Sequence, residues 1–443
     1  MMSKQAFWIV PAICMALLSA CGGGGATTGT DSPQPQAKRD PIELVVYHPF
    51  PQDWSEEDFM KTFGDPMKQK YPHITFKYIA GGKIQDLLTA GQKIDILYTS
   101  IGTVAAQLIE NQLQYDITPQ IKKFNYDLSR LEPTMVDAAK KQAGGNAIYG
   151  IPVLVPPSTI YYNKDIFDKF GVAYPKDGMT WDDLYELSKQ LTRMDSGTQY
   201  YGFASSYGHL AVMNQFSMPL IDPTTRKATF DTNEKWKTFS DNLTRFYKIP
   251  GYNLQANQMS EPNERNRFFK DRNIGMFLAS TALHSEKELG DMNWDLASFP
   301  FYKEMPGVGP QAYPTYFFVT SMSDYKDDAF EAISYLTTDE YQMQKSKEGK
   351  FLTVLNKKEI RQAFGQDNPM YKGKNVKALQ PDKYAPSGGV DKYNATASGE
   401  LNTTLKNVNL GTKDINTALR EAAEKANKKI EEAEAAAAAA GKK

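Results

Sequence analysis

The chain has 443 residues, and its 51 basic and 52 acidic side chains leave a formal net charge of −1. This balance provides no basic field for nucleic-acid binding. Hydrophobic residues make up 41% of the sequence, so a chain of this length can bury a sizeable core and is expected to divide into two lobes.

The N-terminal segment has the features of a secretion signal. Lys4 precedes an apolar run over residues 6–18 that is too short to span a bilayer. The run ends in Leu-Ser-Ala-Cys, which resembles the lipobox of bacterial lipoproteins, where the cysteine is acylated and becomes the new N-terminus. We therefore expect residues 1–20 to be a lipoprotein signal peptide and Cys21 to carry lipid. An ordinary signal peptide followed by a chance cysteine is the alternative.

The segment that follows, residues 21–40, contains mainly Gly, Thr, Ser, Pro and Gln and no large apolar side chain. Such a composition predicts a flexible tether. Cys14 lies inside the expected signal peptide, so the mature chain would keep one lipidated cysteine and form no disulfide. We expect the protein on the cell membrane, lipid-anchored and facing the extracellular side or the periplasm.

From Pro41 onward, short apolar runs alternate with helical patterns. Residues 42–47, 73–79 and 94–100 are predicted strands, and Ser55 is a candidate N-cap for the helix between the first two. This alternation favours βαβ units and a mainly parallel sheet.

Amphipathic helices are predicted further along the chain. Thr180 is a candidate N-cap with Asp183 as its capping-box partner. Residues 234–247 and 327–342 carry apolar side chains at helical spacing, which indicates core-facing stripes. The C-terminal end is helical by propensity.

Several blocks follow one another along the chain: "YGIP" at 149–152, "YYNKDIF" at 161–167, "TWDDL" at 180–184, "RFFKDRNIGMFLAS" at 267–280, "WDLASFPF" at 294–301, the helical segment 318–342 and the terminal helix 414–432. In this order they resemble the extracellular solute-binding proteins of sugar-type ABC importers. One stretch replaces the family's usual Gly-Lys-Ala-Ala with Asp-Arg-Asn-Ile at 271–274, which we interpret as divergence within the family.

The resemblance implies an α/β protein with a two-lobed, periplasmic-binding-protein-like (type II) fold, a hinge and an interlobe ligand cleft. Open α/β sheets bind ligands outside the carboxyl ends of their strands, and two lobes can close by hinge motion. The expected division is lobe 1 at 41–155 plus 298–339, lobe 2 at 158–297 plus 340–432, and a frayed tail at 433–443.

Two adjacent tyrosines, Tyr161 and Tyr162, leave three interpretations open: iron ligands, a stacking surface or wall-facing strand residues. Successive strand residues face opposite sides of a sheet, which disfavours a shared metal ion. We expect one ring in the core and the other, Tyr162, toward the edge of the cleft.

Candidate ligand-binding residues are those that follow strand ends and combine flat rings with polar atoms, as sugars require. Trp54 has an alternative role as a hydrophobic staple ahead of the Ser55 helix. His209 and His284 are weaker candidates. The candidates are His48, Phe50, Asp53, Trp54, Tyr98, Thr99, Ser100, Tyr162, Tyr201, Ser205, Ser280, Thr281, Tyr313 and Tyr316.

The sequence contains no nucleophile elbow, Walker loop or zinc-protease motif, and its acidic pairs lie in predicted first turns of helices. We expect no enzyme activity, no cofactor and no metal. The leading hypothesis is a monomeric, membrane-tethered protein that captures a mono- or oligosaccharide and delivers it to an ABC permease. The alternatives are a binding protein for an anion, metal complex or polyamine, and a lipoprotein hydrolase; a sensing role is not separated from transport.

Overall fold

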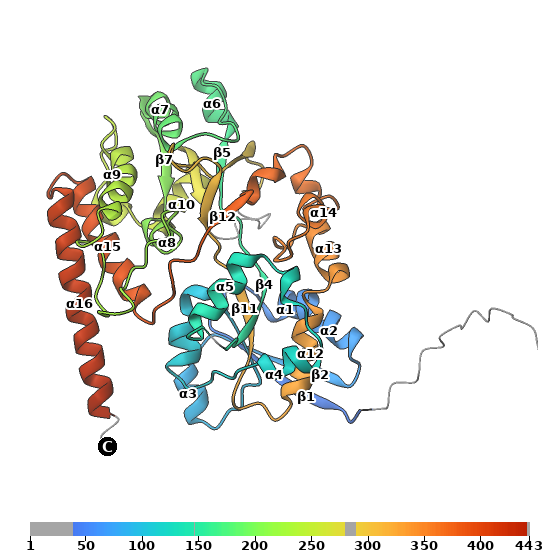
Figure 1. Ribbon diagram of the computed structural model, residues 1–443. Coiled ribbons are helices and arrows are strands. Elements are labelled where there is room, and N and C mark those ends of the chain that lie inside the picture. The colour runs from blue at the N-terminus through green and yellow to red at the C-terminus, as the bar shows by residue number, and fades with distance from the viewer. Residues whose placement is uncertain (1–38, 146, 280–288, 441–443) are drawn as a thin grey trace, which may run out of the picture. The chain divides into compact units, whose positions relative to one another are not determined.

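Two five-stranded β-sheets with helices packed against them organise the protein in the computed structural model, which describes residues 39–145, 147–279 and 289–440 (Figure 1). The expected signal peptide, Cys21 and all of the expected tether except Arg39 and Asp40 lie outside the described residues. From Pro41 the chain forms one contact unit. Within the described ranges, no helix is both long enough and apolar enough to cross a membrane.

The first sheet has the strand order β2-β1-β3-β11-β4. β1 pairs in parallel with β2 and β3, as the sequence predicts, but β11 runs antiparallel to both β3 and β4. Four of the five strands, β1 to β4, therefore run in the same direction, as predicted, and β11 is the exception. The strands are β1 (Ile42–His48), β2 (Ile74–Ala80), β3 (Ile96–Ser100), β4 (Gly150–Leu154) and β11 (Thr315–Val319).

Side chains alternate between two buried faces of this sheet. Tyr98 and Phe317 lie in one hydrophobic cluster, whereas Leu97 and Phe318 lie in another. A strand buried on both faces needs a near-continuous apolar run, which is the pattern of these segments. The helices that contribute to the two clusters are α1 (Glu56–Phe59), α2 (Asp65–Lys70), α3 (Ile84–Thr89), α5 (Pro133–Gln142), α12 (Lys326–Tyr335) and α13 (Asp339–Lys347); α4 (Thr118–Lys123) also follows β3.

The second sheet has the order β6-β7-β8-β5-β9, and β5 runs antiparallel to both of its neighbours. Only β7 and β8 pair in parallel here. A two-stranded ladder of β10 and β12 completes the described sheets. The strands are β5 (Thr159–Asn163), β6 (Arg193–Asp195), β7 (Thr198–Ser205), β8 (Ile274–Ala279), β9 (Trp294–Ser298), β10 (Val308–Gln311) and β12 (Lys383–Ala385).

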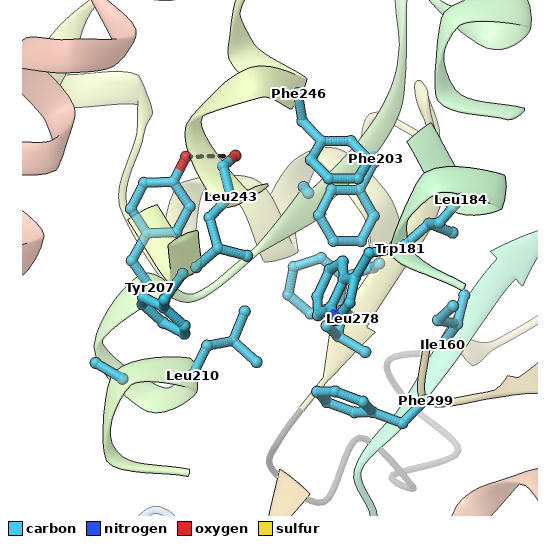
Figure 2. Packing of buried hydrophobic residues seen from close by; sticks show 14 of the residues in the cluster. Ile160, Trp181, Leu184, Phe203, Tyr207, Leu210, Leu243, Phe246, Leu278 and Phe299 are labelled. Atoms are coloured by element: carbon cyan, nitrogen blue, oxygen red, sulfur yellow. Dashed lines mark hydrogen bonds between the residues drawn. The ribbon is translucent and has the colours of Figure 1, made fainter. Parts of the chain in front are cut away.

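Aromatic side chains fill the core against the second sheet (Figure 2). The rings of Phe203 on β7 and Phe246 on α9 lie 4.4 Å apart, and Trp181 contacts both at their edges. The apolar stripe predicted over 234–247 is buried, which confirms its role in the core. The helices of this part are α6 (Lys164–Phe170), α7 (Trp181–Leu191), α8 (Tyr207–Val212), α9 (Lys235–Tyr247), α10 (Glu261–Phe269) and α14 (Lys358–Gln362).

Both predicted N-caps are confirmed. Ser55 Oγ accepts from the Asp58 amide at 3.1 Å. At α7, Thr180 Oγ1 accepts from the Asp183 amide at 3.2 Å, and Asp183 accepts from the Thr180 amide at 2.8 Å. These bonds satisfy amide groups that a helix start leaves without an intrahelical partner.

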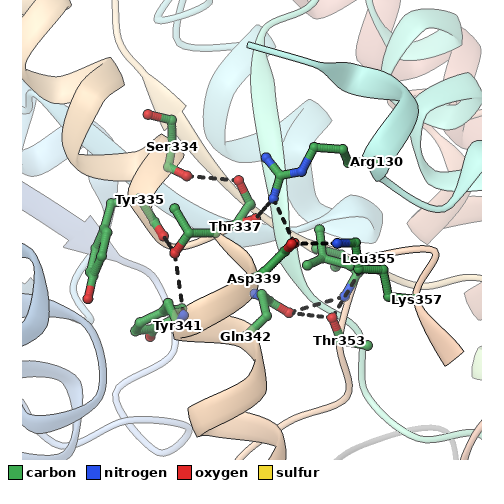
Figure 3. A network of polar contacts seen from close by, with 12 residues as sticks. Arg130, Ser334, Tyr335, Thr337, Asp339, Tyr341, Gln342, Thr353, Leu355 and Lys357 are labelled. Atoms are coloured by element: carbon green, nitrogen blue, oxygen red, sulfur yellow. Dashed lines mark hydrogen bonds and ion pairs between the residues drawn. The ribbon is translucent and has the colours of Figure 1, made fainter. Parts of the chain in front are cut away.

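The prediction of a single helix over residues 327–342 is wrong, because the chain forms α12 and α13 with a break between them (Figure 3). Thr338 caps α13 by accepting from the Tyr341 amide at 3.3 Å. Arg130 donates to the Thr337 carbonyl at 2.6 Å and to Asp339 at 3.2 Å. A distant arginine and a local cap thus stabilise a break that helical periodicity alone does not reveal.

Two C-terminal helices, α15 (Asn394–Asn409) and α16 (Ile415–Ala440), pack side by side and also contact α9 (Figure 1). Ile430 is buried, whereas residues 431–439 are exposed. The exposed side chains give that end little packing, and the expected fraying of residues 433–443 stays a prediction.

We expect Gly202→Ala to destabilise the protein. A Cβ on Gly202 would lie 2.3 Å from the Ser188 carbonyl oxygen and 2.4 Å from the Ser188 Cα, so β7 and α7 would have to separate. Overpacking of this kind costs about 1–3 kcal/mol in unfolding free energy, measurable by urea denaturation. Gly208→Ala is the matched control, because a Cβ there meets nothing within 4 Å. Equal stability of the two variants would contradict the close packing of α7 on β7.

Candidate ligand-binding site

The carboxyl ends of several strands meet at one edge of the first sheet. Ser100 at the end of β3 pairs with Thr315 at the start of β11, which in turn pairs with Leu154 at the end of β4. His48 ends β1 beside them, and its carbonyl accepts from the Gly81 amide at 2.8 Å. We call these residues the first-sheet edge.

A cluster of hydroxyl groups lies at the end of β3. Thr103 Oγ1 bonds Thr99 Oγ1 at 2.7 Å and lies 3.3 Å from Ser100 Oγ. The Tyr313 hydroxyl also interacts with Ser100 and with the backbone of Gly102. A Cβ on Gly102 would lie 1.9 Å from that hydroxyl, so only glycine lets Tyr313 approach. Burial raises the pKa of Tyr313, which keeps the phenol neutral.

His48 lies at the same edge and is almost fully buried, with its side chain 3% exposed. Its Nδ1 lies 2.8 Å from the Tyr98 carbonyl oxygen, and its ring contacts Phe50 edge-on at 5.8 Å. Its Nε2 lies 3.7 Å from Asp53 Oδ2, and the Asp53 side chain is 51% exposed. Two groups that the sequence singles out thus lie close together at the edge.

Two of the aromatic candidates, Tyr98 and Tyr316, serve in packing, and a third, Trp54, is only partly buried. Tyr98 is 1% exposed and stacks on Phe317 at 4.4 Å. Tyr316 is fully buried and donates to the Met135 carbonyl at 3.1 Å. Trp54 is partly buried, with its ring centroid 5.1 Å from that of Phe63.

The second sheet has a corresponding edge, at which β7, β8 and β9 end and β5 begins. Ser205 is buried there at the end of β7, and the Ser206 hydroxyl lies 2.7 Å from His209 Nδ1. Burial lowers the pKa of His209, which favours its neutral form. Ser280 and Thr281, predicted just beyond β8, lie outside the described residues, as does His284.

The candidates Tyr162 and Tyr201 lie away from this edge, so the expectation that Tyr162 faces the edge of the cleft is wrong. Tyr161 packs on Trp294, whereas Tyr162 contacts Phe167, so the two rings face opposite sides of the sheet as expected. Both are buried in one hydrophobic cluster, and Tyr201 lies in the first half of β7. Among the described residues, no group of three or more His, Cys, Asp or Glu side chains is arranged to hold a metal ion.

Sequence reasoning missed Gly102 and Thr103, which shape the hydroxyl cluster. The available signal was the Ser-Ile-Gly-Thr run from Ser100, in which the threonine can reach back to the end of the strand. The close approach of Tyr313 comes from a segment distant in sequence, so no local pattern could reveal it.

A buried carboxylic acid lies behind the second-sheet edge. Glu264 on α10 is 1% exposed and accepts from the Tyr247 hydroxyl at 2.5 Å, with Arg267 at 3.6 Å. Burial raises the pKa of Glu264 to about 7, although Tyr247, Arg267, the Ser205 amide and Lys406 partly offset the rise. The cluster therefore binds a proton close to neutral pH.

Two surface hollows, of about 490 and 550 Å³, share no lining residue with either edge. One is lined by α7, α9 and residues 301–304, and the other by residues 61–69, 344–350 and 367–369. Both are lined by charged side chains of mixed sign that partly pair with each other, such as Asp182 with Arg245. The candidate site is therefore defined by strand ends, and not by these hollows.

The strand order of the two sheets and the helices packed against them define the fold of the protein. It is the two-domain fold of the periplasmic solute-binding proteins. An ABC substrate-binding protein from Listeria monocytogenes, solved in complex with cycloalternan, matches with a TM-score of 0.69 and 20% identity over 88% of this chain and 99% of that chain. A sugar transporter from Rhizobium etli, in an open conformation, matches with a TM-score of 0.68 and 21% identity over 87% of this chain and 99% of that chain.

The sequence identifies the family. The profile of the bacterial extracellular solute-binding proteins matches residues 53–343, and the chain belongs to this family. An uncharacterized ABC transporter extracellular-binding protein from Pyrococcus horikoshii is 28% identical over 194 residues, which are 41% of this chain and 42% of the relative. The match thus spans less than half of that relative. The matched family is one of extracellular binding proteins and not of enzymes.

We expect the buried acid to make stability depend on pH. The Glu264 pKa is raised from 4.5 to about 7, so the stability that its proton contributes is fully present below about pH 4.5 and is lost as the pH rises through about 7. Glu264→Gln keeps the neutral shape. We compare the unfolding free energies of the variant and the wild type. From pH 5 to pH 8, the difference should change by roughly 2–3 kcal/mol in favour of the variant.

Urea denaturation at several pH values measures this difference. Glu304→Gln is the matched control, because Glu304 is exposed and its substitution should give no pH-dependent difference. A parallel pH dependence of the Glu264→Gln variant and the wild type would show that Glu264 does not titrate in this range.

Proposed function

We propose that the protein captures an extracellular mono- or oligosaccharide and delivers it to an ABC permease. The observation that carries the proposal is the set of hydroxyl groups at the first-sheet edge, formed by Ser100, Thr103 and Tyr313. Neutral hydroxyl groups exchange directed hydrogen bonds with the hydroxyls of a sugar. Family membership and the cycloalternan complex of the Listeria protein support the same class of solute.

The aromatic surface at this edge is the second support. Phe50, Trp54 and Tyr313 are partly exposed, unlike the buried Tyr98 and Tyr316. Partly exposed rings can stack on the C–H face of a sugar without leaving the core. We therefore propose these three rings, and not the buried ones, as the stacking surface.

In this proposal the solute is held between two lobes, residues 41–155 plus 298–339 and residues 158–297 plus 340–432. Ser206 and His209 supply polar groups from the second-sheet edge. Binding to both edges would favour closure of the lobes, because a solute stabilises the state that it contacts most extensively.

A cationic solute such as a polyamine is the second candidate. The observation that favours it is Asp53, a half-exposed carboxylate at the first-sheet edge. A single carboxylate can bind an ammonium group, but polyamines need several spaced acceptors. The surrounding hydroxyl cluster is better suited to a polyol.

A thermal-shift panel tests the proposal. We expect D-mannitol, maltotriose, maltotetraose or cycloalternan to raise the melting temperature, because a ligand that binds only the native state stabilises it; spermidine should not. Ser100→Ala should weaken the binding of an active sugar about threefold to tenfold through loss of one hydrogen bond, measured by calorimetry. Ser398→Ala, on α15, is the control. A shift with spermidine alone would favour the second candidate.

Membrane attachment has its own test. We propose that the lipid on Cys21 anchors the protein, with residues 21–40 as the tether. Cys21→Ala should move the protein from the membrane fraction to the soluble fraction, as followed by immunoblotting. Cys14→Ala should leave it on the membrane, because Cys14 lies in the expected signal peptide. Membrane retention of the Cys21→Ala protein would exclude this anchor.

A further inference from the structure

The hydrogen bond from His48 to a backbone carbonyl determines which ring nitrogen carries the proton. The Tyr98 carbonyl oxygen, 2.8 Å from Nδ1, can only accept, so Nδ1 must be the donor. In a neutral imidazole the other nitrogen then has a lone pair and accepts. His48 Nε2 is accordingly a buried acceptor, and it has no hydrogen-bond partner among the described residues.

The group that faces this nitrogen is also an acceptor. Asp53 Oδ2 lies 3.7 Å from Nε2, beyond hydrogen-bond distance, and an ionised carboxylate has no proton to donate. A second histidine–aspartate pair, formed by the residue before β2 and a residue of α12, shows the contrast: His73 Nε2 lies 3.0 Å from Asp328 Oδ1 and forms a hydrogen bond. The His48–Asp53 pair thus consists of two acceptors that face one another without a hydrogen between them.

We propose that His48 and Asp53 form a two-acceptor subsite that selects a neutral solute with adjacent hydroxyl groups, each hydroxyl donating to one of the two side chains. This inference rests on the proposed function, because it assigns the chemistry of the ligand at the same edge. Hydroxyls of a vicinal diol are spaced closely enough to serve two acceptors 3.7 Å apart. Anionic solutes are excluded, because they would bring further acceptors.

Access to Nε2 requires side chains of the 49–53 loop to move. Nε2 is covered in this conformation. The partly buried Phe50 contacts the His48 ring edge-on, and the half-exposed Asp53 faces Nε2. The Tyr98 ring packs against the His48 ring, with the ring centroids 4.7 Å apart. A solute therefore meets a fixed acceptor on the histidine and an adjustable one on the loop.

The test compares His48→Asn, Asp53→Asn and the control His73→Asn by calorimetry at pH 8.0 with D-mannitol, maltotriose, maltotetraose, cycloalternan and spermidine. The asparagine at position 48 can still donate to the Tyr98 carbonyl but lacks Nε2. At position 53 the asparagine amide can donate to His48 Nε2, so that two acceptors no longer face each other. We expect both variants to bind an active sugar at least about tenfold more weakly at pH 8.0, with His73→Asn unchanged.

If wild type binds a sugar while both variants bind it equally well, the subsite is wrong and the proposed function stands. If no sugar binds, both fail. Thermal unfolding of the ligand-free variants checks that they fold. If His48→Asn does not fold, Asp53→Asn, which lies on an exposed loop, still tests the subsite.

Discussion

The antiparallel ladder of β11 between β3 and β4 is the constraint on which the candidate site depends. It aligns Ser100, Thr315 and Leu154 side by side, and it brings Tyr313, just before β11, against Gly102. Residues from three distant parts of the chain thereby share one sheet edge. Because the ladder consists of backbone hydrogen bonds with a side-chain period of two, a slip of one residue would turn Tyr316 and Phe317 to the wrong faces.

Rigid and adjustable parts are combined at this edge. His48 and Thr99 are buried and bonded to the backbone or to neighbouring hydroxyls, whereas Asp53 lies on an exposed loop. Buried polar groups normally have hydrogen-bond partners, so an unpartnered acceptor such as His48 Nε2 is a departure that a ligand can account for. The aromatic residues behind it, Tyr98 and Phe317, keep the histidine from moving.

Local patterns predicted the elements well and the residues of the site less well. The Thr180–Asp183 capping box and the stripe over 234–247 are confirmed, since both depend on neighbours within a few residues. The 327–342 helix failed because Arg130, far away in sequence, stabilises the break. Tyr98 and Tyr316 were predicted to face a ligand because they lie near strand ends, yet both are buried. A strand buried on both faces gives no alternation from which the exposed side could be read.

The sequence by itself determined the family, the α/β class and the positions of most strands, because these follow from motif order and apolar periodicity. Only the tertiary structure decided which strand ends meet, that β5 and β11 run against their neighbours, and that the His48 and Asp53 acceptors face each other. Periodicity records which residues are buried, but not the direction in which a strand is paired. Side-chain geometry at an edge depends on segments hundreds of residues apart, and a single sequence contains no record of their distance.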